Sequence, residues 1–131
     1  MTPDLRLLAY STLLAWVMLI VASMMRVRGW TPAGLQVSFG NRADVSEPSP
    51  AAARADRAAR NMLENLLLFT ALVLTAHAAG VADSRVELGA RIFFWARVAY
   101  WPVYLVGIPY VRTAIWGVSL VGLGLIFSAL M

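Results

Sequence analysis

The stretch "RADRAARNMLENLLLF", residues 54–69, decides the fold, because it leads a charged segment directly into an apolar one. It carries three arginines, two asparagines, an aspartate and a glutamate, whereas residues 66–76 contain no charged side chain. A charged group that approaches lipid loses hydration, so it needs a partner, a ligand or water. The stretch therefore predicts a membrane helix whose polar end is a candidate functional site.

The composition indicates an integral membrane protein. The chain has 131 residues, of which 60% are hydrophobic and only 14% charged, with a mean hydropathy of +0.70. Soluble domains are typically about 45–50% apolar. The length predicts one domain over residues 1–131. With no cysteine and with His77 as the single histidine, we expect neither a metal site nor a cysteine nucleophile.

All eleven basic residues are arginine, and the formal net charge is +4. A GC-rich genome is one explanation for the missing lysine. Arginine also offers a planar fork of donors that suits carboxylates and other anions. We interpret the net charge as a mark of membrane topology and anion affinity, and we expect no nucleic-acid partner.

Four apolar segments approach the roughly 20 residues that a spanning helix needs. They are Leu7–Met25, Met62–Val81, Ile92–Ile108 and Tyr110–Met131. We therefore predict an all-α fold, a four-transmembrane-helix bundle in the lipid bilayer, with helices at about residues 5–27, 50–80, 86–107 and 110–130. No small-x-small cleavage site follows the first segment, so we interpret it as a retained helix. The glycines and prolines of residues 28–55 predict turns and irregular chain, up to a helix start at "SPAAA".

Arginines set the predicted orientation, because short cytoplasmic loops carry an excess of positive charge. One side holds Arg26, Arg28, Arg42, Arg54, Arg57 and Arg112, and the other holds Arg6, Arg85 and Arg91. We expect the first loop to be cytoplasmic and both termini to lie outside, in a bacterial inner membrane.

Polar residues recur at helical spacing near the arginine-rich side. They are Arg57, Arg60, Asn61 and Glu64 on the second predicted helix, Arg97, Tyr100 and Tyr104 on the third, and Arg112 with Thr113 at the start of the fourth. At about 100° per residue, the first four fall within a third of the helix circumference. Arginine exceeds carboxylate in this set, which predicts an anionic ligand.

Each of these residues also has an explanation without a ligand. Arg60 could pair with Glu64, four residues further on. Arg57 and Arg97 could extend toward lipid headgroups, and the tyrosines and tryptophans could form an interfacial belt. His77 lies on the far half of its helix, where a packing or interfacial role explains it better than catalysis.

Four stretches resemble the MAPEG family, the membrane-associated proteins of eicosanoid and glutathione metabolism, and in particular its prokaryotic-type members. The family's second-helix signature, roughly R-x-x-R-x-x-x-N-x-x-E, is similar to "RADRAARNMLE" with Arg54, Arg57, Asn61 and Glu64. The other three are "FFWARVAYWPVYL" with Arg97, Tyr100 and Tyr104, "VRTAIW" with Arg112 and Thr113, and "MMRVRGW" with Arg26.

The resemblance implies a homotrimer that binds glutathione as co-substrate between protomers, near the cytoplasmic side. It implies that Arg26, Arg57 and Arg60 hold the carboxylates of glutathione and that Glu64 accepts from its ammonium group. Asn61, Arg97, Tyr100 and Tyr104 would complete the binding site. Arg112 would stabilise the thiolate, with Thr113 as a second donor, and a lipophilic electrophile or peroxide would arrive from the bilayer.

The implied function is that of a glutathione S-transferase-like enzyme or a peroxidase. Tyr100 stands where some members have histidine, and Asp44 is only a candidate for the acidic residue of a prostaglandin-forming member, so eicosanoid synthesis is not expected. Two alternatives stay open. One is a non-catalytic MAPEG-like protein that binds lipid or glutathione or acts as a scaffold. The other is a small four-helix exporter, which the absence of a carboxylate from the first span disfavours.

Overall fold

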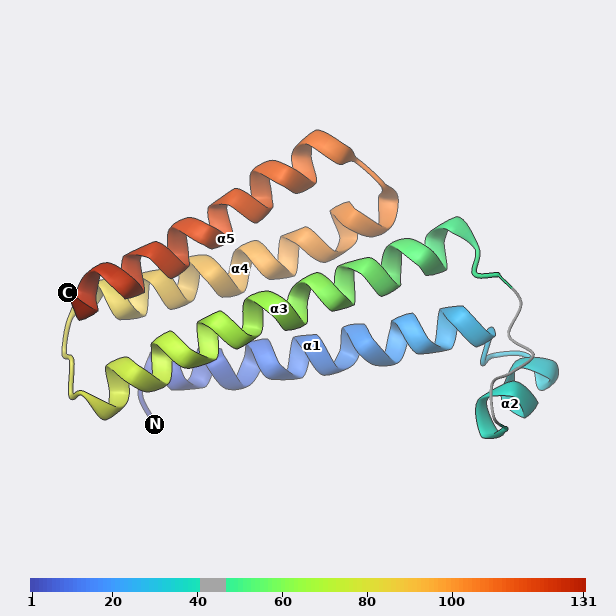
Figure 1. The fold of residues 1–131 in the computed structure, drawn as a ribbon, viewed down its shortest axis with the longest axis horizontal. Helices are drawn as coiled ribbons and strands as arrows, with labels where there is room; N and C mark the ends of the chain where they lie inside the picture. The colour runs from blue at the N-terminus through green and yellow to red at the C-terminus, as the bar shows by residue number, and fades with distance from the viewer. Residues whose placement is uncertain (41–46) are drawn as a thin grey trace.

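The computed structural model describes residues 1–40 and 47–131, and every regular element in those residues is an α-helix. The helices are α1 Pro3–Val27, α2 Pro32–Phe39, α3 Pro50–Ala78, α4 Ser84–Val106 and α5 Pro109–Leu130. The four long helices lie side by side, both termini lie at one end, and α2 lies beyond the other (Figure 1). The prediction of an all-α chain is therefore confirmed.

The segment after α1 contains a helix that its sequence did not lead us to expect. Pro32 occupies the first turn of α2, where its fixed φ suits a helix and its missing N–H is not needed. Thr31 Oγ1 accepts a hydrogen bond from Gly34 N at 3.0 Å. A Cβ at position 34 would lie 1.9 Å from the Arg28 carbonyl oxygen, so only glycine lets α2 approach α1 this closely. The expectation of irregular chain was wrong here, because the proline marks a helix start.

Three helices in the described residues are long and apolar enough to cross a membrane, namely α1, α3 and α5. We accordingly describe the chain as an integral membrane protein. The 23 residues of α4 would extend about 35 Å, against a hydrocarbon core of about 30 Å. Its first turns carry Arg85, Glu87 and Arg91, however, and a fourth span through α4 stays a prediction.

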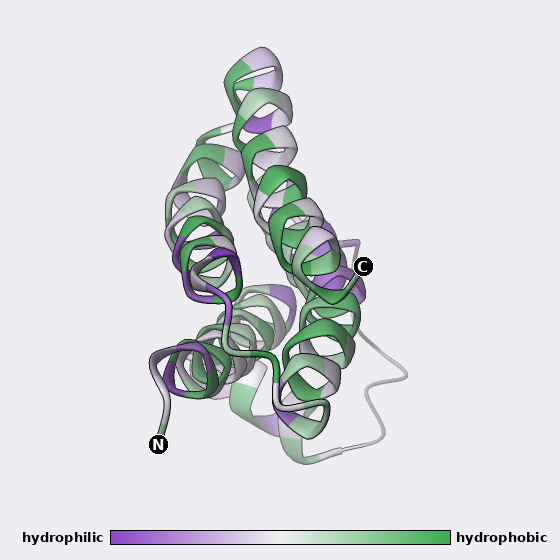
Figure 2. Cartoon of the chain, turned by 90° about the vertical axis from the view of Figure 1, so that its left-hand side faces the viewer, coloured by the Kyte–Doolittle hydropathy of each residue, from purple (hydrophilic) through white to green (hydrophobic). Residues whose placement is uncertain are grey.

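Large apolar side chains cover the outside of the bundle as well as its inside. Leu67, Trp95 and Val121 are 71%, 63% and 59% exposed in the single chain. Figure 2 shows hydrophobic residues around the circumference of the helices, with hydrophilic ones gathered in a few short segments. Patches of this kind mark contact with a membrane or another protein, and lipid or neighbouring protomers would cover them.

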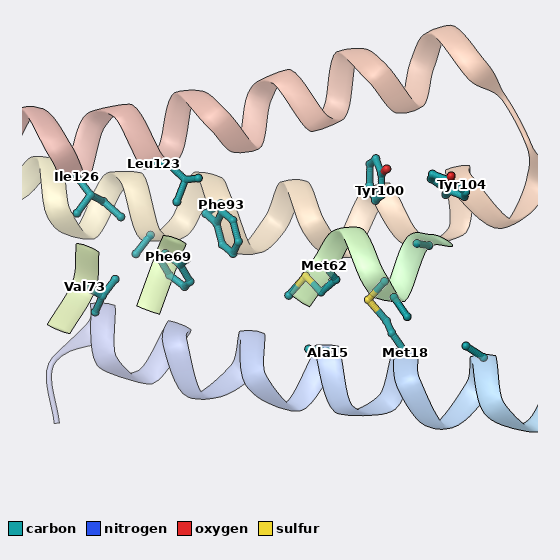
Figure 3. Packing of buried hydrophobic residues seen from close by; sticks show 14 of the residues in the cluster. Ala15, Met18, Met62, Phe69, Val73, Phe93, Tyr100, Tyr104, Leu123 and Ile126 are labelled. Atoms are coloured by element: carbon teal, nitrogen blue, oxygen red, sulfur yellow. The ribbon is translucent and has the colours of Figure 1, made fainter. Parts of the chain in front are cut away.

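The core lies where α1, α3 and α4 meet and continues to α5. Phe69 of α3 stacks on Phe93 of α4 with ring centroids 4.2 Å apart, and both side chains are fully buried. Met18 and Met62 fill the space between α1 and α3 (Figure 3). This packing fixes α3 against α4, which places the polar residues of both helices at a common level.

Two glycines set the approach of α4 to α5. A Cβ added to Gly89 would lie 2.5 Å from the Gly122 carbonyl oxygen, and one added to Gly122 would lie 2.6 Å from the Gly89 carbonyl oxygen. Helices in membranes commonly associate through small residues that let their backbones touch. The contact holds the two helices together near the end that carries the termini.

The turn between α3 and α4 is closed by a carboxylate cap. Asp83 Oδ1 accepts from the Arg85 backbone N at 2.8 Å, and Arg85 Nη2 donates to Asp83 Oδ2 at 2.8 Å. These hydrogen bonds hold the pKa of the Asp83 carboxyl below its usual value. Arg85 Nη1 also donates to Ser128 Oγ at 3.2 Å, which ties the start of α4 to the end of α5.

Candidate functional site

A hollow opens between α3, α4 and α5. It lies toward the end of the bundle that carries the α4–α5 turn, an end that Figure 1 shows opposite the termini. Its volume is about 110 Å³. Five residues line it: Asn61 from α3, Tyr100 from α4, and Arg112, Thr113 and Trp116 from α5. Four of the residues predicted from sequence therefore meet in one place, and none of the five lining residues is acidic.

The α4–α5 turn places Arg112 at the hollow. Gly107 ends α4 in the left-handed region at φ 87°, and Pro109 begins α5. Arg112 therefore lies in the first turn of α5, where the helix dipole is positive. Its guanidinium carbon lies 4.9 Å from the ring centroid of Tyr104, so the side chain is held over an aromatic face. Thr113 Oγ1 donates to the Pro109 carbonyl at 3.1 Å, which leaves its lone pairs available.

Arg97 is the most unusual residue of the site. Its side chain is only 1% exposed, and Nη2 donates to Asn61 Oδ1 at 2.7 Å. Nε and Nη1 have no hydrogen-bond partner, and no carboxylate of the described residues forms an ion pair with the group. The guanidinium lies 4.3 Å from the centroid of the Tyr100 ring. Arg97 thus puts an uncompensated positive charge directly behind two residues that line the hollow.

A second asparagine orients Asn61. Asn65 Nδ2 donates to the Asn61 carbonyl at 2.9 Å and to Asn61 Oδ1 at 3.3 Å, and Asn65 is buried. Asn61 Oδ1 therefore accepts from both Arg97 and Asn65. Because its oxygen is taken, its amide N–H groups are the part that can serve a ligand.

Tyr104 connects the hollow to the outer arginines. Its ring lies 5.4 Å from that of Tyr100, one turn away on α4 (Figure 3). Its hydroxyl accepts from Arg57 Nε at 3.3 Å. Arg57 is otherwise exposed, so its terminal nitrogens can reach a ligand beyond the hollow. One aromatic side chain thus contacts Arg112 on one side and Arg57 on the other.

The remaining predicted arginines lie on the α1 side of α3. Arg60 Nη2 is 3.2 Å from Asp56 Oδ2, and Arg26 Nη1 is 4.0 Å from Asp56 Oδ1. Both side chains are exposed, at 72% and 51%. Arg60 pairs with Asp56 and not with Glu64, so the pairing suggested as the alternative is wrong. Glu64 is exposed and does not line the hollow.

His77, which the sequence analysis also weighed, does not line the hollow. His77 lies near the C-terminal end of α3 and is exposed. Arg42 and Asp44 lie outside the described residues. The described residues also contain no cluster of acidic and histidine side chains that could hold a metal ion.

The arrangement is suited to binding an anion. Arg112 lines the hollow and Arg97 lies behind its wall, next to Asn61 and Tyr100. The described residues that line the hollow include no carboxylate. Charges interact more strongly where water is excluded, because the effective dielectric constant is lower. An anionic group in the hollow would therefore be attracted by two guanidinium groups at once.

The sequence profile of the MAPEG family matches residues 7–131, which is nearly the whole chain and includes all five lining residues. The chain belongs to the MAPEG family. A comparison with curated proteins found no match. The family membership proposed from four short motifs is thereby confirmed.

This MAPEG chain uses three further residues that the motifs did not single out as site residues. Asp56 forms ion pairs with Arg26 and Arg60, and Asn65 orients Asn61. Arg54 Nε donates to the Leu105 carbonyl at 3.0 Å. Asp56 and Asn65 were within reach of sequence reasoning, since each lies four residues from a predicted site residue, which is one helical turn. Arg54 joins segments that are 51 residues apart, so only the fold reveals its partner.

Proposed function

We propose that this MAPEG protein is a membrane-bound, glutathione-dependent transferase or peroxidase that acts on lipophilic electrophiles. The observation that carries the proposal is the pair of guanidinium groups at one small hollow, whose described lining residues include no carboxylate. Glutathione brings two carboxylates and a thiol that reacts as its anion. The site thus has the charge that a thiolate needs.

The first role of the site is to hold the thiolate. A free thiol with a pKa near 8.5 is mostly protonated at neutral pH, and a fixed cation favours the anion. We assign this role to Arg112, with the N-terminal dipole of α5 adding to it. Thr113 becomes a second donor once its hydroxyl leaves the Pro109 carbonyl. The thiol loses its proton to solvent, and the sulfur then forms a bond to carbon as the leaving group departs with its electron pair.

The second role is to hold the rest of the tripeptide. Arg26, Arg57 and Arg60 have exposed guanidinium groups that can form bidentate bonds to carboxylates. Glu64, also exposed, would accept from the ammonium group. The Asn61 amide would donate to a peptide carbonyl of glutathione. Tyr100 and Tyr104 supply apolar area beside it.

The size of the hollow supports a trimer. Small-molecule sites usually enclose about 300–1,000 Å³, whereas this one encloses about 110 Å³. One chain therefore provides one wall, and a neighbouring protomer would provide the other. We propose a homotrimer of four-span bundles with glutathione between protomers. The first loop would be cytoplasmic and both termini outside, in a bacterial inner membrane.

A binding and turnover experiment tests the proposal. Detergent-solubilised protein is titrated calorimetrically with glutathione and with S-methylglutathione, and conjugation of a generic aryl halide is then measured. We expect both glutathione and its thioether, S-methylglutathione, to bind and only glutathione to react. Binding without turnover would instead support the non-catalytic MAPEG-like protein, and absence of binding would overturn both.

Replacement of Arg97 by methionine separates binding from folding. We expect the affinity for glutathione to fall about tenfold, or about 1.4 kcal/mol, since the positive charge behind the wall of the hollow no longer attracts the anion. The thermal midpoint of the ligand-free protein should not fall, because the change removes a buried charge without a carboxylate partner. Calorimetry and thermal unfolding measure the two effects.

The matched variant Arg97→Lys keeps the charge and loses the planar fork. It should bind glutathione more tightly than Arg97→Met and less tightly than the wild type. A large loss of stability in Arg97→Met would show that the guanidinium has an unseen partner, for example in a neighbouring protomer, and would contradict the reasoning above.

A further inference from the structure

Two hollows that share Tyr10 run along the α1–α4 side. They begin at the end of the bundle that carries the termini, which Figure 1 shows opposite the α4–α5 turn, and extend toward its middle. The first, here called the polar hollow, encloses about 270 Å³ and is lined by Pro3, Arg6, Leu7, Tyr10, Arg91 and Trp95. The second, here called the apolar groove, encloses about 290 Å³ and is lined by Tyr10, Leu13, Leu14, Val17, Phe94 and Val98. Tyr10 lines both, so they form one continuous surface.

The charges of the polar hollow suit a single negative group. Arg91 pairs with Glu87, whereas no ion pair within the described residues involves Arg6. Asp4 lies two positions before Arg6, about 200° around the helix, and does not line the hollow. One positive charge is thus left over, and a phosphodiester carries one negative charge at neutral pH.

The aromatic residues place these hollows at the edge of the membrane. Trp95 and Tyr10 are 63% and 50% exposed, and amphipathic rings of this kind are enriched at the level of lipid headgroups. The Tyr10 ring is braced by Phe94, with centroids 6.1 Å apart. Residues 14 and 17 continue the wall away from the charges with apolar side chains only.

The length of the surface fits one membrane leaflet. The eleven helical steps from Arg6 to Val17 extend about 16 Å. This is about half of a hydrocarbon core of roughly 30 Å. A headgroup site at one end and an apolar groove of leaflet length at the other match a lipid better than a soluble anion.

We propose that the α1–α4 surface binds one phospholipid, with its phosphate at Arg6 and Arg91 and one acyl chain along the apolar groove. The site is separate from the glutathione site and does not depend on it. The guanidinium groups donate to the phosphate oxygens, Trp95 and Tyr10 flank the headgroup, and Phe94 and Val98 contact the chain. The lipid would anchor α1 to α4 at the end opposite to the catalytic hollow.

Native mass spectrometry of the full chain in detergent tests this, with phosphatidylglycerol as the probe and inorganic phosphate as the competitor. The double variant Arg6→Gln with Arg91→Gln should weaken lipid binding about 30-fold, from about 1 kcal/mol for each arginine. Arg85→Gln removes the same charge at the same end from outside the hollow, and it should stay within about twofold of wild type.

A second pair of variants tests the groove independently of charge. Val98→Trp fills the groove and should abolish retention of the lipid, whereas Leu67→Trp, on an exposed face of α3, should not. The proposal is overturned if Arg85→Gln weakens binding as much as the double variant or if inorganic phosphate displaces the lipid at similar concentrations. It is equally overturned if Val98→Trp dissociates the oligomer and the wild type retains no lipid, since a second copy would then cover this surface.

Discussion

Replacement of Arg112 by alanine is expected to lower kcat about 10²–10³-fold, while the affinity for glutathione stays within about threefold of wild type. The reason is that Arg112 contacts the hollow from the first turn of α5 and would act on the sulfur. The carboxylates would be held by other arginines. A group that stabilises charge on the reacting atom affects turnover more than ground-state binding.

The measurement combines aryl halide conjugation with an ultraviolet titration of the bound thiol. In the wild type, the thiolate should form at a lower pH than it does in free glutathione, and in Arg112→Ala this shift should largely disappear. Arg28→Ala, an exposed arginine outside the hollow, serves as the control and should change neither quantity. Unchanged turnover in Arg112→Ala would remove this residue from the mechanism.

Replacement of Gly122 by alanine is expected to destabilise the protein by about 2–3 kcal/mol, an unusually large effect for one methyl group. Its Cβ would lie 2.6 Å from the Gly89 carbonyl oxygen and 2.9 Å from the Phe93 N. Backbone atoms cannot turn aside as a flexible side chain can, so α4 and α5 would have to move apart. Equilibrium unfolding in mixed detergent, followed by circular dichroism, measures the loss.

Gly124 provides a matched control on the same helix, since no other atom lies within 4 Å of a Cβ added there. Gly124→Ala should stabilise the helix by up to about 1 kcal/mol, because alanine favours helix more than glycine does. The two substitutions are chemically identical and are expected to differ in sign. Equal effects would mean that α4 and α5 do not pack through these glycines.

The long helices could be predicted from the sequence because the patterns that indicate them are local. Apolar runs of about 20 residues, bounded by Pro and Gly, predict helices without knowledge of what they contact. The short α2 was missed because its start signal, Thr31 followed by Pro32, stands in a segment whose other prolines and glycines favour turns. What makes α2 a helix is partly its contact with the end of α1, through Gly34.

The candidate site could be predicted only in part from the sequence, for a geometric reason. The polar side of α3 spans about 100° of the helix, with Arg60 at one edge and Asn61 at the other. Asn61 therefore faces α4 and α5, while Arg60 faces α1 and meets Asp56. Periodicity predicts that these residues lie on the same side of α3. It does not predict which of them face α1 and which face α4 and α5.

Arg97 shows the same limit. Its sequence position was compatible with a ligand contact or with a side chain that extends to headgroups, and the structure instead buries it behind Asn61. Burial depends on the approach of α3 to α4, which the stacked Phe69 and Phe93 fix one turn from Arg97 on α4 and about two turns from Asn61 on α3. A buried cation of this kind is a product of tertiary packing.

The contact between Gly89 and Gly122 is a point about which α5 can pivot, and it lies far from the first turn of α5. Arg112 stands ten residues from Gly122, a lever arm of about 15 Å. A tilt of about 5° at this point would swing the guanidinium by about 1.3 Å, and misplacement by about 1 Å can cost 10²-fold in rate. Substitutions around Gly122 would therefore change the reaction rate by moving Arg112, without replacing any residue that lines the hollow.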